Sequence, residues 1–99
     1  LTPSELVLAL QNGASLVKIF PASLLGPGYL KALRGPFPGL KCIPTGGLSS
    51  DNVLAFMKAG AAGVGMGGSL VDSDMIRENN WEALTLEAKK VKKLVASPF

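Results

Sequence analysis

Lys18 is the residue whose type and position most directly suggest covalent chemistry. It lies inside the apolar run Leu16-Val17-Lys18-Ile19-Phe20, where strand alternation places Leu16, Lys18 and Phe20 on one face. A charged amine in a parallel strand is costly unless it is paired, desolvated to its neutral form, or placed at a strand end that faces a cavity. A neutral amine can attack a carbonyl carbon and form a Schiff base. The pattern fits this chemistry about as well as it fits a lysine that protects an edge strand or extends its amine to solvent.

Two glycine pairs are the second feature that could do chemistry. Thr45-Gly46-Gly47 and Gly67-Gly68-Ser69 each follow an apolar segment and precede an expected helix. Glycines there let backbone N–H groups approach an anion closely, and the helix N-terminus adds a favourable dipole. Tight turns also need glycine for conformational reasons alone. Because two equivalent pairs follow in succession, the pattern favours phosphate binding over turn geometry alone.

Other candidate residues have simpler structural explanations. Thr45 could donate a hydrogen bond to a carboxylate or cap a turn, and its place beside the glycines favours the first. Phe20 shares the Lys18 face and could pack on a substrate, although an aromatic residue there is more often core. Cys42 is expected to be a small buried hydrophobe. Trp81 and Tyr29 are expected to anchor helices, and the lysines near the C-terminus to form a solvated helix face.

The start of the chain predicts a helix with a defined beginning and end. Thr2 is the expected N-cap, Pro3 takes the first helical position, and Glu5 completes a capping box. Gly13 stands where a left-handed C-cap is needed. The apolar face of this helix is expected to consist of Leu6, Val7 and Leu10.

Strand and helix patterns then alternate along the rest of the chain. We expect a strand over 14–20, a helix over 29–34, a strand over 40–43, a helix that Ser49 or Ser50 caps and Gly60 ends, and a strand over 62–66. A final helix carries a stripe at helical spacing, formed by Trp81, Leu84, Ala88, Val91 and Val95. This alternation predicts an α/β fold with a parallel sheet and right-handed crossovers. Three strands are too few to close a barrel, so the chain is expected to be part of something larger.

Composition excludes several classes of function. The 99 residues contain no histidine and one cysteine, which excludes Ser-His-Asp and Cys-His catalysis, an internal disulfide and zinc-finger spacing. The net charge of +3 comes from dispersed basic residues with few aromatics, so no nucleic-acid surface is expected. Neither a long apolar run nor a basic-then-apolar leader occurs, so no membrane span or signal peptide is expected. A soluble domain of a reducing compartment remains.

The order of the motifs resembles a known family. Val17-Lys18-Ile19-Phe20-Pro21-Ala22 is followed by Gly35-Pro36-Phe37, then Pro44-Thr45-Gly46-Gly47, then Gly67-Gly68-Ser69. This series closely resembles the C-terminal half of the class I aldolases that act on 2-keto-3-deoxy-6-phosphogluconate and 4-hydroxy-2-oxoglutarate. The resemblance covers nearly the whole chain. It implies a (β/α)8 TIM barrel of which residues 1–99 form a single C-terminal part, with its strands as the sixth, seventh and eighth.

The resemblance also implies roles for individual residues. Lys18 matches the Schiff-base lysine, Phe20 a residue lining the substrate pocket, and Thr45 one near the pyruvyl portion. The residues that match the phosphate-binding turns are Gly46, Gly47, Gly67, Gly68 and Ser69. The implied reaction cleaves a phosphorylated keto acid to pyruvate and glyceraldehyde 3-phosphate, or the smaller substrate to pyruvate and glyoxylate. It needs no metal and no organic cofactor, and the family is usually a cytoplasmic homotrimer.

The sequence departs from the family at several points. Family members are about twice as long, and their general acid/base glutamate and carboxylate-binding arginine belong to a part absent here. The glutamates present lie on expected helices or caps, and none is promoted to that role: Glu5, Glu78, Glu82 and Glu87. Leu70 stands where an aromatic residue is common. Because the chain begins at Leu1, it also fits a trimmed, catalytically incomplete fragment that keeps the imine and phosphate sites without turnover. A third hypothesis is a fragment of another phosphate-binding barrel, such as a thiamine-phosphate synthase relative.

Overall fold

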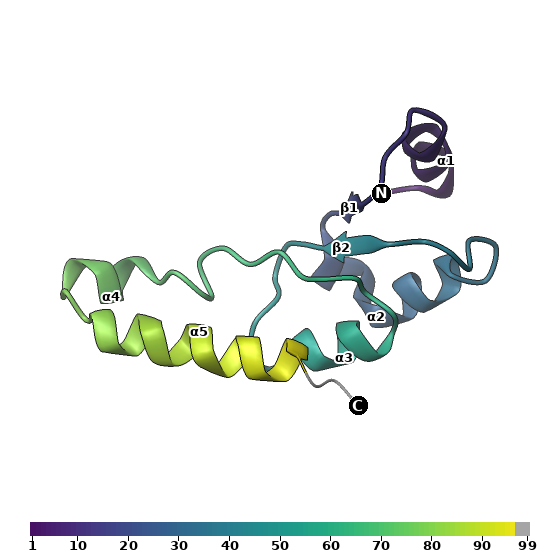
Figure 1. Ribbon diagram of the computed structural model, residues 1–99. Coiled ribbons are helices and arrows are strands. Elements are labelled where there is room, and N and C mark those ends of the chain that lie inside the picture. The colour runs from purple at the N-terminus through teal and green to yellow at the C-terminus, as the bar shows by residue number, and fades with distance from the viewer. Residues whose placement is uncertain (97–99) are drawn as a thin grey trace.

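The computed structural model describes residues 1–96, in which helices and strands alternate as far as β2 and three helices follow (Figure 1). The elements are α1 (Pro3–Gln11), β1 (Val17–Ile19), α2 (Ala22–Leu33), β2 (Cys42–Pro44), α3 (Val53–Lys58), α4 (Ser73–Arg77) and α5 (Trp81–Ala96). In Figure 1, α1 lies at one end of the molecule, and α4 with most of α5 extends away from the strands at the other.

β1 and β2 pair in parallel, as the alternating pattern predicts. The register places Val17 opposite Cys42, Lys18 opposite Ile43 and Ile19 opposite Pro44. The α/β class with parallel strands is therefore confirmed.

The third expected strand, over 62–66, forms only in part. A single parallel bridge joins Thr45 to Gly65, and the Ala62 and Gly65 N–H groups each donate a 2.9 Å hydrogen bond to the segment at β2. Glycines at positions 63 and 65 give this segment low strand propensity, so it runs alongside β2 without forming a regular ladder.

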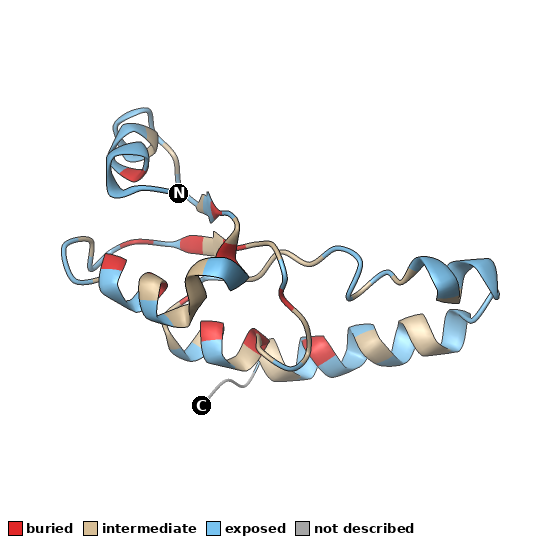
Figure 2. Cartoon of the chain, turned by 180° about the vertical axis from the view of Figure 1, so that it is seen from behind, coloured by how far each residue is buried: buried red, intermediate tan, exposed pale blue. Residues whose placement is uncertain are grey.

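The two faces of the sheet differ in what covers them. Ile19, Cys42 and Pro44 point to the face on which α2 and α3 pack, and all three are buried. Figure 2 shows buried residues on the strands and on the helices beside them. The same core contains residues from both helices and the loops: Ala22, Leu30, Leu33, Leu40, Leu48 and Phe56. The opposite face, called the open face below, carries Leu16, Lys18 and Phe20, all of them exposed. The Lys18 amine lies over the Phe20 ring, as alternation predicts for these two residues.

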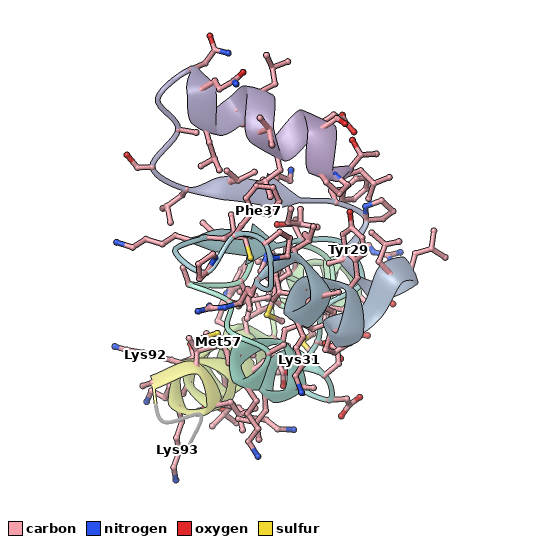
Figure 3. All side chains as sticks on the ribbon, turned by 90° about the vertical axis from the view of Figure 1, so that its right-hand side faces the viewer. Tyr29, Lys31, Phe37, Met57, Lys92 and Lys93 are labelled. Atoms are coloured by element: carbon pink, nitrogen blue, oxygen red, sulfur yellow. The ribbon has the colours of Figure 1, made fainter. Side chains whose placement is uncertain are left out.

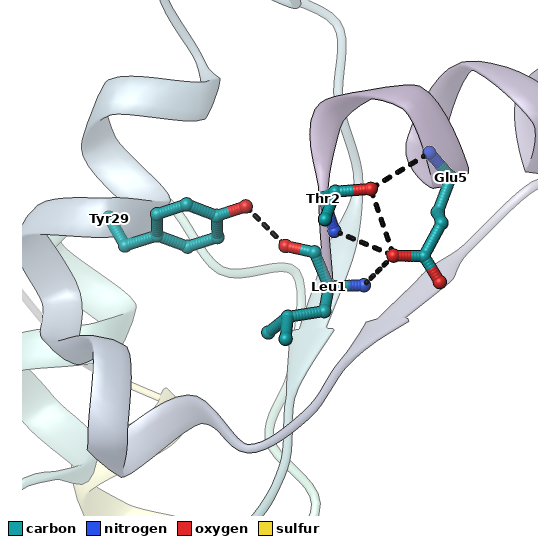
Figure 4. Close-up of polar contacts among 4 residues, drawn as sticks. All are labelled: Leu1, Thr2, Glu5 and Tyr29. Carbon is teal, nitrogen blue, oxygen red and sulfur yellow. Dashed lines mark hydrogen bonds and ion pairs between the residues drawn. The ribbon is translucent and has the colours of Figure 1, made fainter.

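α1 begins as predicted, with a complete capping box (Figure 4). The Thr2 hydroxyl accepts a 3.2 Å hydrogen bond from the Glu5 N–H, and the Glu5 carboxylate accepts one of 3.1 Å from the Thr2 N–H. Gly13 has φ of 88°, which confirms the expected left-handed C-cap position. The predicted apolar face is only partly right. Leu6 is buried, whereas Val7 and Leu10 remain exposed.

α2 starts earlier than the expected range of 29–34. An additional turn runs from Ala22, and a kink at Gly26, where φ is 79°, separates this turn from the expected helix. Tyr29 is half-buried between α2 and the chain start, and its hydroxyl donates to the Leu1 carbonyl (Figures 3 and 4). Tyr29 thus anchors its helix, as expected.

The expected cap of the following helix is wrong. Neither Ser49 nor Ser50 caps α3, because Asn52 occupies the N-cap and the chain first makes a turn. In that turn the Asn52 Oδ1 accepts a 2.8 Å hydrogen bond from the Ser49 N–H. α4 was not predicted. The Asp72 carboxylate caps it by accepting hydrogen bonds from two backbone N–H groups, which its sequence permits but does not require.

α5 is confirmed as the final helix, and its stripe is buried only where α3 meets it. Val91 is buried, but Trp81, at the far end of α5, is 56% exposed and does not anchor the helix, contrary to expectation. The four clustered lysines are exposed, as predicted, and Figure 3 shows Lys92 and Lys93 pointing outward. Within residues 1–96, no helix is long and apolar enough to cross a membrane.

Candidate active site

A cleft opens where β2 and the neighbouring 62–66 segment end. Its volume is about 460 Å³. Its walls come from three connections of the chain and consist of Phe20, Thr45, Gly46, Gly47, Leu48, Ser49, Gly67, Gly68 and Ser69. Seven of the eight site residues expected from the sequence therefore lie around one cavity.

Lys18, the eighth, lies beside this cleft and does not line it. Its Nζ is 5.7 Å from the centroid of the Phe20 ring, which forms part of the cleft wall. Both interpretations of Lys18 were left open by its sequence pattern, and within residues 1–96 its side chain is exposed on the open face. β1 pairs only with β2 within residues 1–96, so Lys18 also lies on an edge strand, where its charge disfavours further pairing.

The first glycine turn is held tightly against the connection between β1 and α2. Gly46 and Gly47 have φ of 100° and 73°, a backbone region that favours glycine. A Cβ at Gly46 would lie 2.8 Å from the Phe20 ring, and one at Gly47 would overlap the Ser23 side chain. Tight geometry therefore suffices to explain both glycines.

The second glycine turn has no such requirement. Gly67 and Gly68 do not adopt positive φ, and a Cβ at either would meet no atom within 4 Å. The Gly67 carbonyl accepts hydrogen bonds of 2.9 Å from the N–H groups of residues 70 and 71, which closes the turn. Neither backbone conformation nor packing within residues 1–96 requires glycine here, so the pair leaves the backbone of this turn uncovered at the cleft.

Ser69 joins the two turns, and both turns carry backbone N–H groups that are free of protein acceptors within residues 1–96. The Ser69 hydroxyl donates to the Leu48 carbonyl, so its proton is engaged within the protein. Within residues 1–96, the backbone N–H groups of Gly47, Gly67, Gly68 and Ser69 donate no hydrogen bond. These donors, on walls with no carboxylate side chain, suit a bound anion.

The expected contribution of helix dipoles is not met. α3 starts at Val53 and α4 at Ser73, so both glycine turns are separated from a helix N-terminus by further residues. Because the macrodipole acts within about one turn of the helix end, free N–H groups of the turns are the main electrostatic feature of the cleft.

Three residues at the cleft were missed by sequence reasoning. Leu48 and Ser49 line it, and Gly65 pairs with Thr45 at its inner edge. Leu48 and Ser49 follow the glycine pair directly, which is a usable signal. Gly65 could have been found from the alternation of glycines at 63, 65 and 67, which leaves one face of that segment without side chains.

The ionisable groups outside the cleft do not supply an acid or base to it. Glu5 sits in the α1 capping box, where hydrogen bonds from Thr2 lower the pKa of its carboxyl. Glu78, Glu82 and Glu87 are not among the cleft residues. Burial raises the pKa of the Cys42 thiol, although the charge of Arg34 acts in the opposite direction. No group of three or more His, Cys, Asp or Glu side chains able to hold a metal ion occurs in the described part of the chain.

Comparison with known proteins gives a consistent family. The family profile described as KDPG and KHG aldolase matches residues 1–86. The chain is 40% identical over 70 residues to the 2-dehydro-3-deoxy-6-phosphogalactonate aldolase of Escherichia coli strain K12, covering 70% of this chain and 34% of that protein. It is 37% identical over 84 residues to the 2-dehydro-3-deoxy-phosphogluconate aldolase of Haemophilus influenzae, covering 83% and 39% of the two chains.

Solved structures agree with the sequence relatives. A structure described as native KDPGal has a TM-score of 0.79 at 32% identity and covers 97% of this chain and 47% of its own. A 4-hydroxy-2-oxoglutarate aldolase from TTHB1 has a TM-score of 0.80 at 30% identity and covers 96% and 45%. This chain thus spans between a third and a half of the length of these relatives. The chain belongs to the KDPG and KHG aldolase family.

Proposed function

We propose that residues 1–99 form one unit that supplies the sixth, seventh and eighth strands of a (β/α)8 barrel. Family membership and the parallel order of β1, β2 and the 62–66 segment support this placement. The exposed open face supports it further, because barrel strands point every second side chain inward, where Leu16 and Phe20 would be covered by the other strands.

We infer that the cleft carries out Schiff-base aldol cleavage, with Lys18 as the catalytic residue. The Lys18 amine attacks the C2 keto carbon of the substrate, and loss of water gives an iminium. A base removes the C4 hydroxyl proton, the C3–C4 bond breaks, and its electron pair moves into the iminium to give an enamine and an aldehyde. Protonation of the enamine at C3 and addition of water then release pyruvate and regenerate the amine.

The cleft is suited to hold the distant phosphate of such a substrate. Four backbone N–H groups without a protein acceptor lie at its rim, and Gly46 and Gly47 shape the first turn. Phe20 would pack on the carbon chain and the Thr45 hydroxyl would donate to the pyruvyl portion. The observation that carries the proposal is that these residues surround one cleft. The Lys18 amine lies beside it, 5.7 Å from the centroid of the Phe20 ring in the cleft wall.

The full reaction class is cleavage of 2-keto-3-deoxy-6-phosphogluconate to pyruvate and glyceraldehyde 3-phosphate, or of 4-hydroxy-2-oxoglutarate to pyruvate and glyoxylate. The names of the relatives support this substrate class. By the same resemblance the working protein is a cytoplasmic homotrimer without an organic cofactor. Membership in the aldolase family replaces the hypothesis of a thiamine-phosphate synthase relative.

A second candidate function applies to the 99-residue chain by itself. No carboxylate side chain lines the cleft within residues 1–96, and general acid–base help is worth about 10²–10⁴-fold. We therefore propose as the alternative that this chain alone forms the imine and binds phosphate without appreciable turnover.

A coupled assay of pyruvate release separates the two candidates. The chain is incubated with 2-keto-3-deoxy-6-phosphogluconate, and pyruvate is followed by its reduction with lactate dehydrogenase and NADH. The Lys18→Met variant removes the amine, and Lys31→Met, an exposed lysine on α2, is the matched control. Pyruvate release by the wild type that Lys18→Met abolishes and Lys31→Met retains supports the lyase. A borohydride-trapped adduct on Lys18 without pyruvate release supports the alternative. Release that persists in Lys18→Met overturns both.

A further inference from the structure

Thr45 and Gly65 face one another across the only bridge between β2 and the 62–66 segment in the part of the chain that the structure describes. Val64 and Met66 pack against the hydrophobic core, so alternation turns Gly63 and Gly65 to the opposite, open face. Thr45 is half-buried there and forms part of the cleft wall. The Thr45 side chain therefore packs directly against the Gly65 backbone.

The space at Gly65 is occupied by the Thr45 side chain. A Cβ built at Gly65 would overlap the Thr45 Oγ1, and would lie 3.0 Å from its Cγ2 and 3.1 Å from its Cβ. The backbone of Gly65 does not have positive φ, so conformational freedom does not explain the glycine. A Cβ at Gly63, two residues earlier on the same face, would meet nothing within 4 Å.

Hydrogen bonding does not fix the Thr45 hydroxyl firmly. Its one hydrogen bond within residues 1–96 goes to the Ile43 carbonyl at 3.4 Å, which is at the long limit for such a bond. The rotamer of Thr45 is thus set mainly by the space available to it. That space is free because residue 65 is a glycine and has no side chain.

We propose that Gly65 is a positioning residue that holds the Thr45 hydroxyl at the cleft wall for the bound keto acid. A methyl group at position 65 would turn Thr45 about χ1 and carry Oγ1 away from its present place. This inference deepens the proposed function and rests on it for its catalytic meaning. The steric part concerns these two residues alone, so it is tested whether or not the chain is an enzyme.

The test compares Gly65→Ala with Gly63→Ala, which adds the same methyl on the same face without a contact. The first readout is the Thr45 χ1 angle, measured in solution from three-bond couplings of its methyl carbon. We expect Gly65→Ala to change the Thr45 rotamer and Gly63→Ala to leave it as in the wild type. An unchanged rotamer in Gly65→Ala overturns the inference.

The second readout is the pyruvate concentration that gives half-maximal borohydride-trapped adduct at Lys18. We expect Gly65→Ala to raise it about tenfold, the equivalent of one lost hydrogen bond to a charged group, and Gly63→Ala to leave it unchanged. In the Thr45→Ala background, the same Gly65→Ala change is expected to have no further effect, because the displaced hydroxyl is already gone. Equal effects in both backgrounds overturn the positioning role.

Two other outcomes are separated by these arms. If the wild type forms no Lys18 adduct, the proposed function fails while the χ1 comparison still decides the steric inference. If Gly65→Ala alone does not fold, the Thr45→Ala/Gly65→Ala double variant replaces it. Recovered folding in the double variant supports a conflict at Oγ1, and continued failure to fold overturns it.

Discussion

Lys18 and Cys42 stand on neighbouring strands but on opposite faces of the sheet, and their environments differ accordingly. Lys18 is exposed on the open face, whereas Cys42 is fully buried beneath the helices. Strand alternation predicts both placements from the sequence. It does not predict how far Lys18 is desolvated, because that depends on what lies above the open face and not on the order of residues in β1.

The burial of Cys42 gives a prediction about its reactivity. Desolvation raises the pKa of its thiol, so the reactive thiolate is disfavoured in the folded chain. We expect iodoacetamide at pH 8 to modify Cys42 at least about 100-fold more slowly in the native protein than in denaturant. Rapid alkylation of the native chain would contradict this burial.

The raised pKa of the Cys42 thiol also affects how stability depends on pH. The contribution of the thiol to the free energy of unfolding is expected to be intact below the pKa of the unfolded thiol and to fall as the pH rises above it.

Among the helices and strands, caps formed by neighbouring residues were predictable from the sequence. Caps that depend on contacts with other loops were not. The α1 capping box follows directly from Thr2-Pro3-Ser4-Glu5. The prediction for the cap of α3 was wrong because Ser49 and Asn52 both have side chains that can cap a helix. The turn between them depends on contacts with the glycine turn, including the hydrogen bond from the Asn52 Nδ2 to the Gly47 carbonyl. α4 was missed because five residues are too few for a periodic pattern.

The capping box makes α1 sensitive to acid. Hydrogen bonds from Thr2 lower the pKa of Glu5, so its contribution is present above the pKa of the unfolded carboxyl and is lost as the pH falls through the folded value. We expect the thermal stability of the wild type to fall between about pH 5 and pH 3 more than that of Glu5→Gln, which keeps the hydrogen bonds without the charge. Circular dichroism melting curves of the two proteins provide the comparison. Parallel pH dependence in both would show that Glu5 has no such role.

At the level of the whole molecule, the open face combines exposed apolar side chains with a strand edge that has no partner within residues 1–96. Leu16 and Phe20 are 51% and 55% exposed, and β1 has no partner on its outer edge within residues 1–96. Sequence reasoning anticipated this from the number of strands alone. The prediction of a full strand over 62–66 gave too little weight to the low strand propensity of glycines 63 and 65, and the segment forms a single bridge.

Exposed apolar surface and a free strand edge predict self-association of the isolated chain. We expect size-exclusion chromatography with light scattering to give a mass above the monomer value of 10.2 kDa that rises with protein concentration. Leu16→Ser, which removes an apolar side chain from the open face, should shift the protein toward the monomer, while Leu86→Ser on the outer side of α5 should not. A wild-type chain that remains monomeric at all concentrations would refute this prediction.

Borohydride trapping with pyruvate, followed by intact mass spectrometry and peptide mapping, tests the imine chemistry of Lys18 most directly. We expect one reduced pyruvate adduct per chain, located on Lys18, absent in Lys18→Met and retained in Lys31→Met. We also expect inorganic phosphate to leave the adduct in place, because the glycine turns and the amine occupy different parts of the site. No adduct, or adducts distributed over the exposed lysines, would contradict the assignment of Lys18 as the Schiff-base residue.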